Sequence, residues 1–307
     1  MRVPPQIGLL PDGRRLHLQN GPIDLVICAY GPRPSVVQGY ERAARRFATI
    51  LEELCDELAL LRTAAQPGAC PLQGKVARRM HRAVEPYAAA SFITPMAAVA
   101  GAVAEEILAA MTDGAALDRA YVNNGGDIAL HLAEGANFTI GMVDRPERPS
   151  LFGSLTIETG DGIAGIATSG RHGRSFSLGI ADAVTVLARS AAEADAAATI
   201  IANVVDLPAN HPKVRRAPAR SVQPDSDLGD RLVTRGVDPL TGFEIDQALA
   251  AGMACAEDLV EAGLIRAAAL HLQGVTRIAG GLEGMRLPPR GMPGRVETVS
   301  IGERPYA

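Results

Sequence analysis

The chain has 307 residues, a length that suits one large domain or two closely packed lobes. Hydrophobic residues make up 47% and charged residues 21%, which is typical of a globular protein. Its formal net charge of −4 supplies no overall attraction to nucleic acid or to an anionic membrane, so we expect neither as a partner. Aromatic residues make up 4% and Trp is absent, so the core must be built from Ala, Leu, Ile and Val.

The N-terminal part predicts three strands followed by a long helix. Residues 7–10 and 15–18 flank a Pro-Asp-Gly turn, and residues 23–30 form an apolar run suited to a buried strand. From residue 40 to residue 61, apolar side chains recur at alternating intervals of four and three. This spacing predicts an amphipathic helix with a structural role.

A loop at residues 63–74 and a short basic helix at residues 76–84 come next. The following segment, residues 95–111, is built almost wholly of small residues and predicts a closely packed helix. Thr94 stands where the N-cap of that helix is expected. The two glutamates at 105–106 are expected to form a solvated edge.

The pattern then changes to short apolar segments separated by Gly, Asp and Pro, which predict strands. These segments are residues 120–124, 127–132, 138–143, 154–158, 162–167 and 183–188. Ser190 and Glu193 match a capping box, which places the next helix start near residue 191. A helix at 244–262 and strands at 264–273 and 296–301 complete the chain.

Long helices beside many short strands predict an α+β protein with a mostly antiparallel sheet, in one domain over residues 1–307. Residues 207–235, rich in Pro and polar residues, are the most irregular stretch and are interpreted as a lid or a poorly ordered excursion. Helices of small residues are compatible with a homodimer.

Four cysteines show no CxxC or metal-finger spacing, so we expect unpaired thiols in a reducing compartment; they are Cys28, Cys55, Cys70 and Cys255. The N-terminal residues lack the apolar core of a secretion signal, and no apolar run is expected to reach the length of a membrane span. We therefore expect a cytoplasmic protein.

Asp195 and Thr199 are the first candidate site residues. Four positions apart on a helix, their side chains share one face and offer the hard oxygen ligands that Mg²⁺ prefers. The alternative is local, since an Asp near a helix N-terminus is favoured by the helix dipole and a mid-helix Thr can bond to the backbone.

The loop at residues 168–175 (TSGRHGRS) is the second candidate. Its glycines allow backbone N–H groups to converge, and Arg171 and Arg174 add guanidinium groups suited to a phosphate. It matches neither a P-loop nor a dinucleotide fingerprint, and an exposed basic turn is the alternative. His172, within this loop, is given no role.

Gly125, Gly126 and Asp127 are the third candidate, because two glycines after a strand let a ligand approach the backbone and Asp127 can accept a hydrogen bond from it. A tight turn with an Asx cap is the alternative. Asp182, between the basic loop and the next strand, is the candidate catalytic residue, with a local cap as its alternative.

The chain resembles the ApbE-like superfamily, whose characterised members are FAD:protein FMN transferases. The resemblance is carried by four pieces in the family's order: Gly125-Gly126-Asp127, Thr168-Ser169-Gly170, Val184-Thr185-Val186 and Ala194-Asp195-Ala196-Ala197-Ala198-Thr199. The closer resemblance is to the UPF0280 branch, through residues 94–101 (TPMAAVAG) and 177–182 (SLGIAD).

This resemblance implies an ApbE-like fold of two interlocked α+β subdomains with the ligand between them. It implies that Asp195 and Thr199 bind Mg²⁺ and that the Gly-Gly-Asp piece lies at the site of a flavin nucleotide, FAD or FMN. The candidate nucleotide contacts are then Gly125, Gly126, Asp127, Thr168, Ser169, Gly170, Arg171 and Arg174.

FMN transferases carry His-x-x-Asp-Pro-x-Thr-Gly where this chain has residues 177–182, a difference that bears on the reaction more than on the nucleotide site. Three functions stay open. They are FMN transfer from FAD to a protein Thr or Ser, an enzyme acting on another small phosphorylated or anionic metabolite, and a non-catalytic flavin or nucleotide carrier. The link of some ApbE-like proteins to sulfur assimilation gives one context for the second.

Overall fold

A computed structural model describes residues 4–143 and 151–281 of the chain. Nine strands form one sheet in which every neighbouring pair is antiparallel. In spatial order they are β1 (Gln6–Leu9), β2 (Leu16–Asn20), β3 (Ile23–Tyr30), β4 (Arg119–Asn124), β5 (Asp127–Leu132), β8 (Gly165–Ser169), β9 (Ala183–Ala188), β12 (Ala267–Leu272) and β13 (Val275–Gly280). The predicted α+β class with a mostly antiparallel sheet is confirmed, while the division into subdomains stays a prediction.

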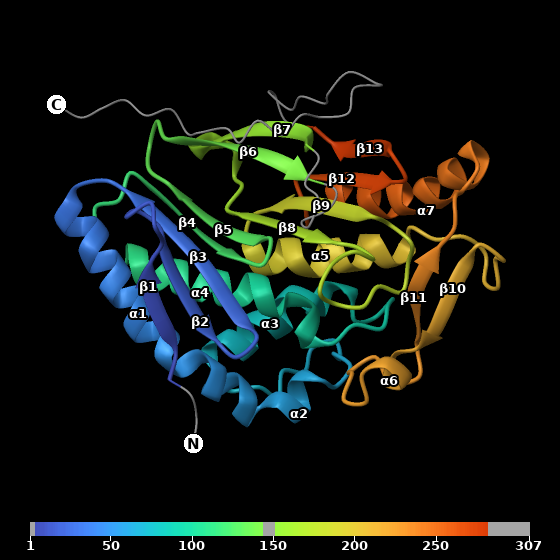
Figure 1. The fold of residues 1–307 in the computed structure, drawn as a ribbon, viewed down its shortest axis with the longest axis horizontal. Coiled ribbons are helices and arrows are strands. Elements are labelled where there is room, and N and C mark those ends of the chain that lie inside the picture. Colours follow the sequence, from blue (N-terminus) through green and yellow to red (C-terminus); the bar gives the residue numbers. More distant parts are fainter. Residues whose placement is uncertain (1–3, 144–150, 282–307) are drawn as a thin grey trace.

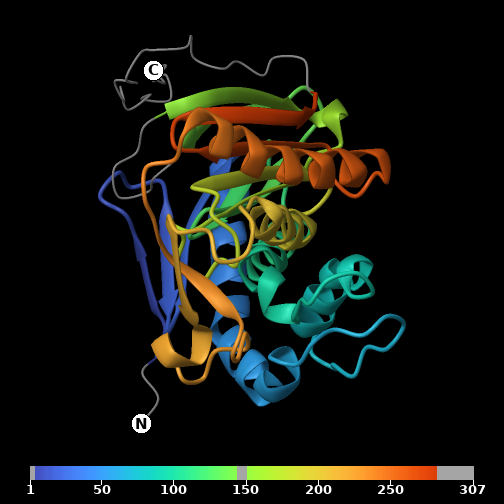
Figure 2. The same cartoon turned by 90° about the vertical axis from the view of Figure 1, so that its right-hand side faces the viewer.

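Four helices cover one face of the sheet and pack side by side in the order α1 (Arg33–Asp56), α4 (Val99–Thr112), α5 (Ala191–Val204) and α7 (Gly242–Glu261). Figure 1 shows strands β1 to β3 running in a direction clearly different from that of β12 and β13, so the sheet is strongly twisted across its width. Seen after a quarter turn, α7 crosses one end of the molecule and α3 (Lys75–Val84) lies near the other (Figure 2).

The opposite face carries a two-stranded ribbon, β6 (Asn137–Val143) and β7 (Leu151–Glu158). Phe138, Leu155 and Ile157 from this ribbon form a small second core with Leu130 and Ile166 of the main sheet. The short elements α2 (Leu58–Leu61), η1 (Glu85–Tyr87), η2 (Pro95–Ala98) and η3 (Thr159–Asp161) join the larger ones.

Small residues let α4 and α5 approach closely. A Cβ atom added at Gly101 of α4 would lie 2.2 Å from the carbonyl oxygen of Ala191, the first residue of α5. Helix α5 starts where the capping box predicts, with the N–H of Glu193 donating to the Ser190 hydroxyl. Contact between Gly101 and Ala191 therefore sets how near α4 lies to the polar face of α5.

Residues 94–112 begin as predicted but differ in two contacts. Thr94 occupies the N-cap position ahead of Pro95 in the 3₁₀ turn η2, but its hydroxyl makes no capping bond and donates to the Asp227 carboxylate at 2.5 Å. Glu106 is buried rather than solvated, because Arg46, Lys75 and Arg79 reach it as ion-pair partners. Neither contact is visible in the sequence, since the partners come from distant segments.

Residues 207–235 are more regular than expected. They contain β10 (Val214–Pro218), the single turn α6 (Ala219–Val222) and the start of β11 (Leu232–Val237). We call the whole segment from the start of β10 to the end of β11, residues 214–237, the excursion. Arg216 fastens it through a bidentate ion pair with Asp206 and a hydrogen bond to the Leu178 carbonyl. Figure 1 shows the excursion at one end of the molecule.

One stretch, Pro95–Thr112, is long and apolar enough in composition to cross a membrane, contrary to our expectation from the sequence. More than half of it is buried in the fold, where α4 contacts α1, α5 and strands β4 and β5. This is the environment of a core helix of a globular protein.

The four cysteines are unpaired, as expected. The strand expected at 296–301 lies outside the described residues.

Gly101→Ala should destabilise the protein by about 1–3 kcal/mol, because the added methyl group forces α4 away from α5. Urea unfolding of the wild type and the variant measures this difference. Gly242→Ala, at the start of α7 with no atom near its missing Cβ, is the matched control. Equal midpoints for the two variants would show that the α4–α5 contact is not tight.

Candidate functional site

The turn between β4 and β5 carries the Gly-Gly-Asp piece. Gly125 and Gly126 have φ angles of 68° and 116°, values that side chains rarely allow. The N–H of Gly126 donates to the Asn123 side chain at 2.8 Å, so the turn does contain the Asx hydrogen bond considered as the alternative. That bond uses Asn123 and leaves Asp127 for other contacts.

Asp127 and Asp195 come together from different elements. Asp127 begins β5 and accepts the N–H of Thr168, the fourth residue of β8, at 3.2 Å. Asp195, on α5, accepts the N–H of Gly101 at 3.0 Å. The two carboxylates are close enough for the charge of Asp127 to act on Asp195. A hydrogen bond of 3.1 Å from the Asn124 amide to the Ala100 carbonyl fixes the turn to α4.

Burial makes ionisation of both carboxylates unfavourable. The pKa of Asp127 rises from 3.8 to about 7, mainly through desolvation, against the opposing effects of the Thr168 N–H and Arg174. The pKa of Asp195 is also well above its ordinary value, first through desolvation and then through repulsion by Asp127. A cation bound between them would remove both penalties.

The donor set suits a hard cation. Asp195 and Thr199 share one face of α5 and are half-buried, and the Asp127 carboxylate adds a third oxygen group to the same region. Among the described residues, however, no group of three or more His, Cys, Asp or Glu side chains is arranged to hold a metal. Any cation here would therefore take further ligands from phosphate or water, as Mg²⁺ commonly does.

Arg174 lies directly against the Gly-Gly-Asp turn. A Cβ atom at Gly125 would fall 1.7 Å from its guanidinium, so the turn needs glycine there for space as well as for conformation. The side chain is exposed, and within the part of the chain that the structure describes it has no carboxylate ion pair. Its positive charge partly opposes the rise in the pKa of Asp127 that desolvation causes. The structure thus brings the basic loop and the Gly-Gly-Asp turn together.

Arg171 points the other way, into an ion pair with Asp182. Its Nε donates to Oδ1 of Asp182 at 2.7 Å, and Oδ2 of the same carboxylate accepts the N–H of Gln273 at 2.6 Å. His172 lies 3.2 Å from Oδ1, and the Asp182 side chain is 3% exposed. These contacts anchor the loop, while the catalytic role of Asp182 and the phosphate role of Arg171 stay predictions.

Thr168, Ser169 and Gly170 form the end of β8 and the start of the loop. The Thr168 hydroxyl is 2.9 Å from that of Thr185 on β9, so it is tied to the sheet, whereas its N–H reaches Asp127. A Cβ atom at Gly170 would lie 2.5 Å from the Asp182 carbonyl oxygen. Asn124 and Thr185, which were not among the predicted site residues, hold the turn to α4 and Thr168 to the sheet.

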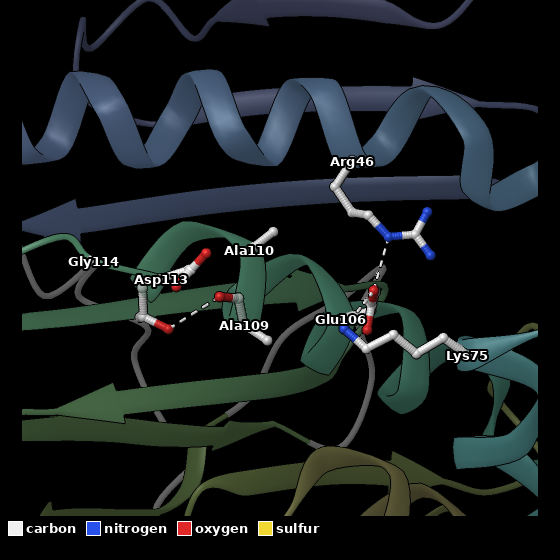
Figure 3. A pocket seen from close by; sticks show the side chains of 8 residues that line it. Arg46, Lys75, Glu106, Ala109, Ala110, Asp113 and Gly114 are labelled. Atoms are coloured by element: carbon white, nitrogen blue, oxygen red, sulfur yellow. Dashed lines mark hydrogen bonds and ion pairs between the residues drawn. The ribbon is translucent and has the colours of Figure 1, made fainter.

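A pocket of about 580 Å³ lies elsewhere, between α1, the start of α3 and the C-terminal half of α4 (Figure 3). Arg46 and Lys75 reach from two helices towards Glu106 at its wall. The carboxylate of Glu106 is satisfied by these cations and Arg79. None of the predicted site residues lines this pocket.

A family model described as "AbpE bacteria" matches residues 7–278. A UPF0280 protein of Methanopyrus kandleri is 43% identical over 131 residues, which are 42% of this chain and 49% of that protein. A UPF0280 protein of Methanothrix thermoacetophila is 42% identical over 114 residues, 37% of this chain and 46% of its own. The matched region thus spans about half the length of these relatives.

Two solved structures are similar over most of the chain at low identity. The flavinyl transferase ApbE of Pseudomonas stutzeri, in its apo form, has a TM-score of 0.41 at 15% identity, covering 90% of this chain and 95% of that one. The ApbE protein of Thermotoga maritima has a TM-score of 0.41 at 11% identity, covering 90% and 96%.

The raised pKa of Asp127 predicts a stability that falls as the pH rises. Between about pH 4 and pH 7 the folded chain keeps a proton that the unfolded chain has released, so the free energy of unfolding decreases by up to about 1.4 kcal/mol per pH unit. Asp127→Asn should make this decrease shallower, which urea unfolding at several pH values measures. Asp113→Asn, on an exposed residue after α4, is the control. An unchanged slope in Asp127→Asn would contradict the raised pKa.

Proposed function

The chain belongs to the family described as AbpE bacteria, and from that membership and the site geometry we propose that it binds a flavin nucleotide, FAD or FMN, together with Mg²⁺. The site lies between the Gly-Gly-Asp turn, the basic loop and α5. The observation that carries the proposal is the pairing of Asp127 with Asp195, two carboxylates from separate elements that burial and mutual repulsion make costly without a cation.

Asp195, Thr199 and Asp127 would hold the cation, which would neutralise phosphate charge and polarise a phosphoryl oxygen. Arg174 would bind a phosphate beside it through charge-assisted hydrogen bonds, because its guanidinium is exposed and already positioned against Gly125. The glycines of the turn leave the backbone open to the ligand. Arg171 would anchor the loop through its ion pair with Asp182, which neutralises its charge.

FMN transfer from FAD to a protein hydroxyl is the stronger form of the proposal. The hydroxyl oxygen would form a phosphoester bond to the FMN phosphorus as the pyrophosphate bond of FAD breaks, with AMP as the leaving group and the hydroxyl proton released to solvent. Arg174 would stabilise the charge that develops on the phosphate of AMP. Asp182, the catalytic candidate, could take part only if it left its contacts with Arg171 and the Gln273 N–H.

A second function, nucleotide binding without transfer, is favoured by residues 177–182. Transferases of the resembled family carry their His-x-x-Asp-Pro-x-Thr-Gly segment there, whereas here Leu178 donates to the Asn203 side chain and Gly179 packs against the Ala202 carbonyl. This segment is held by structural contacts. A carrier, or an enzyme acting on another anionic metabolite, would keep the binding groups and lack the transfer chemistry.

The direct test is calorimetric titration of the protein with FAD, FMN and ADP, each with and without Mg²⁺. We expect FAD and FMN to bind more tightly when Mg²⁺ is present, because the cation links the carboxylates to phosphate. Asp195→Asn should abolish the Mg²⁺ dependence, whereas Asp113→Asn should preserve it. If the wild type bound each ligand with equal affinity with and without Mg²⁺, the metal assignment would be wrong. If it bound none of the three ligands, the nucleotide assignment would be wrong.

Arg174→Ala should weaken FMN binding about tenfold or more, since a charge-assisted hydrogen bond contributes about 1.5–3 kcal/mol. Riboflavin, which has no phosphate, should bind the variant and the wild type equally. Arg215→Ala removes an exposed arginine paired with Asp238 and is the control. If Arg174→Ala weakened both ligands equally, Arg174 would not be a phosphate contact.

A further inference from the structure

A nucleotide needs a surface for its planar ring, and aromatic side chains are scarce in this chain. The sequence contains no Trp, six Phe and five Tyr. Among the aromatic side chains that the structure describes, most are engaged away from the candidate site. Phe47 and Tyr87 are buried in the core, and Tyr30, Tyr121 and Phe138 pack together on the face of the sheet that carries the β6–β7 ribbon. The Tyr40 hydroxyl accepts a hydrogen bond from the N–H of Ala29 on β3. Phe243 is exposed in the first turn of α7. Phe92 and Phe176 remain.

Phe176 belongs to the loop that carries Arg174. It follows Arg174 by two residues, and the chain immediately beyond it is fixed, because the N–H of Thr234 on β11 donates to the Ser177 carbonyl at 2.9 Å. The ring is partly exposed. One end of this short segment thus lies at the Gly-Gly-Asp turn and the other at the excursion.

Arg235, the next residue along β11, places its guanidinium 5.9 Å from the centre of the Phe176 ring. The distance lies at the outer limit of a cation–π contact, and Arg235 is exposed. In the described part of the chain Arg235 has no carboxylate ion pair. It therefore adds positive charge beside the ring without covering it closely.

Phe92 differs from Phe176 in this respect. The guanidinium of Arg231 lies 3.2 Å from the centre of the Phe92 ring, so one face of that ring is already taken. Two further contacts join this part of the excursion to the segments before α4: the ion pair of Arg62 with Asp225 and the hydrogen bond of Thr94 with Asp227. Phe92 is thus part of the contact that fastens the tip of the excursion.

We propose that Phe176 is the platform on which the planar ring of the bound nucleotide stacks. The inference rests on the proposed function, which supplies the phosphate contact at Arg174. It adds a ring subsite on the same loop, which a small anion without a ring would not use. Stacking on an aromatic side chain is worth a factor of about ten or more in affinity.

The test compares Phe176→Leu, which removes the ring and keeps an apolar side chain, with Phe176→Tyr, which keeps the ring. Calorimetry with Mg²⁺ present gives the affinities for FMN, ADP and inorganic pyrophosphate, a probe without a ring. We expect Phe176→Leu to weaken FMN or ADP, whichever ring the site takes, about tenfold or more, and Phe176→Tyr to restore that affinity. Pyrophosphate should bind all forms equally. Phe92→Leu, at the ring covered by Arg231, is the matched control and should leave all affinities unchanged.

Two results would overturn the ring subsite alone. Unchanged nucleotide affinity in Phe176→Leu would show that the ring does not stack there. An equal loss of pyrophosphate would show that the substitution disturbs the phosphate site. Pyrophosphate binding by the wild type without binding of FMN or ADP would overturn the nucleotide assignment and the ring subsite together, and would leave only a phosphate site. Failure of the wild type to bind any of the three probes would instead overturn the proposed function, and the ring subsite with it.

Discussion

The close contact of α4 with α5 determines where the polar groups of the site lie. Gly101 has no side chain, so its backbone reaches the first turn of α5 and its N–H can donate to Asp195. Asn124 then ties the Gly-Gly-Asp turn to α4 through the neighbouring Ala100 carbonyl. A larger residue at position 101 would move this N–H away from Asp195. The site is therefore a consequence of helix packing, and its loops are arranged around that contact.

The local elements follow from the sequence, because each is set by neighbouring residues. The buried strand at 23–30 matches β3, and the Ser190 cap gives the start of α5 at Ala191. What the sequence does not reveal are partners brought from far along the chain. Thr94 takes the predicted N-cap position, but the sequence does not show that its hydroxyl bonds to Asp227, 133 residues away. Glu106 was expected to be solvated because its cations come from the distant segments α1 and α3.

The same limit applies within the site. The motifs identify Asp127, Asp195 and Arg174 individually, and only the fold shows that the first two repel each other and that the third packs on Gly125. Arg171 and Arg174 look equivalent in the sequence, yet one is held by Asp182 and the other faces the Gly-Gly-Asp turn. Charge and spacing alone could not separate an anchoring arginine from an available one.

The hydrogen bond from the Gln273 N–H to Asp182 has a consequence for the order in which the protein matures. The two residues are 91 positions apart, and β12, which pairs with β9, ends just before Gln273. During synthesis the basic loop, β8 and β9 emerge long before their last partner, so β9 presents an open edge while the excursion and α7 are being made. The loop gains its final anchor only when the β12–β13 hairpin docks. Until that docking, Asp182 lacks the backbone N–H that holds its second carboxylate oxygen.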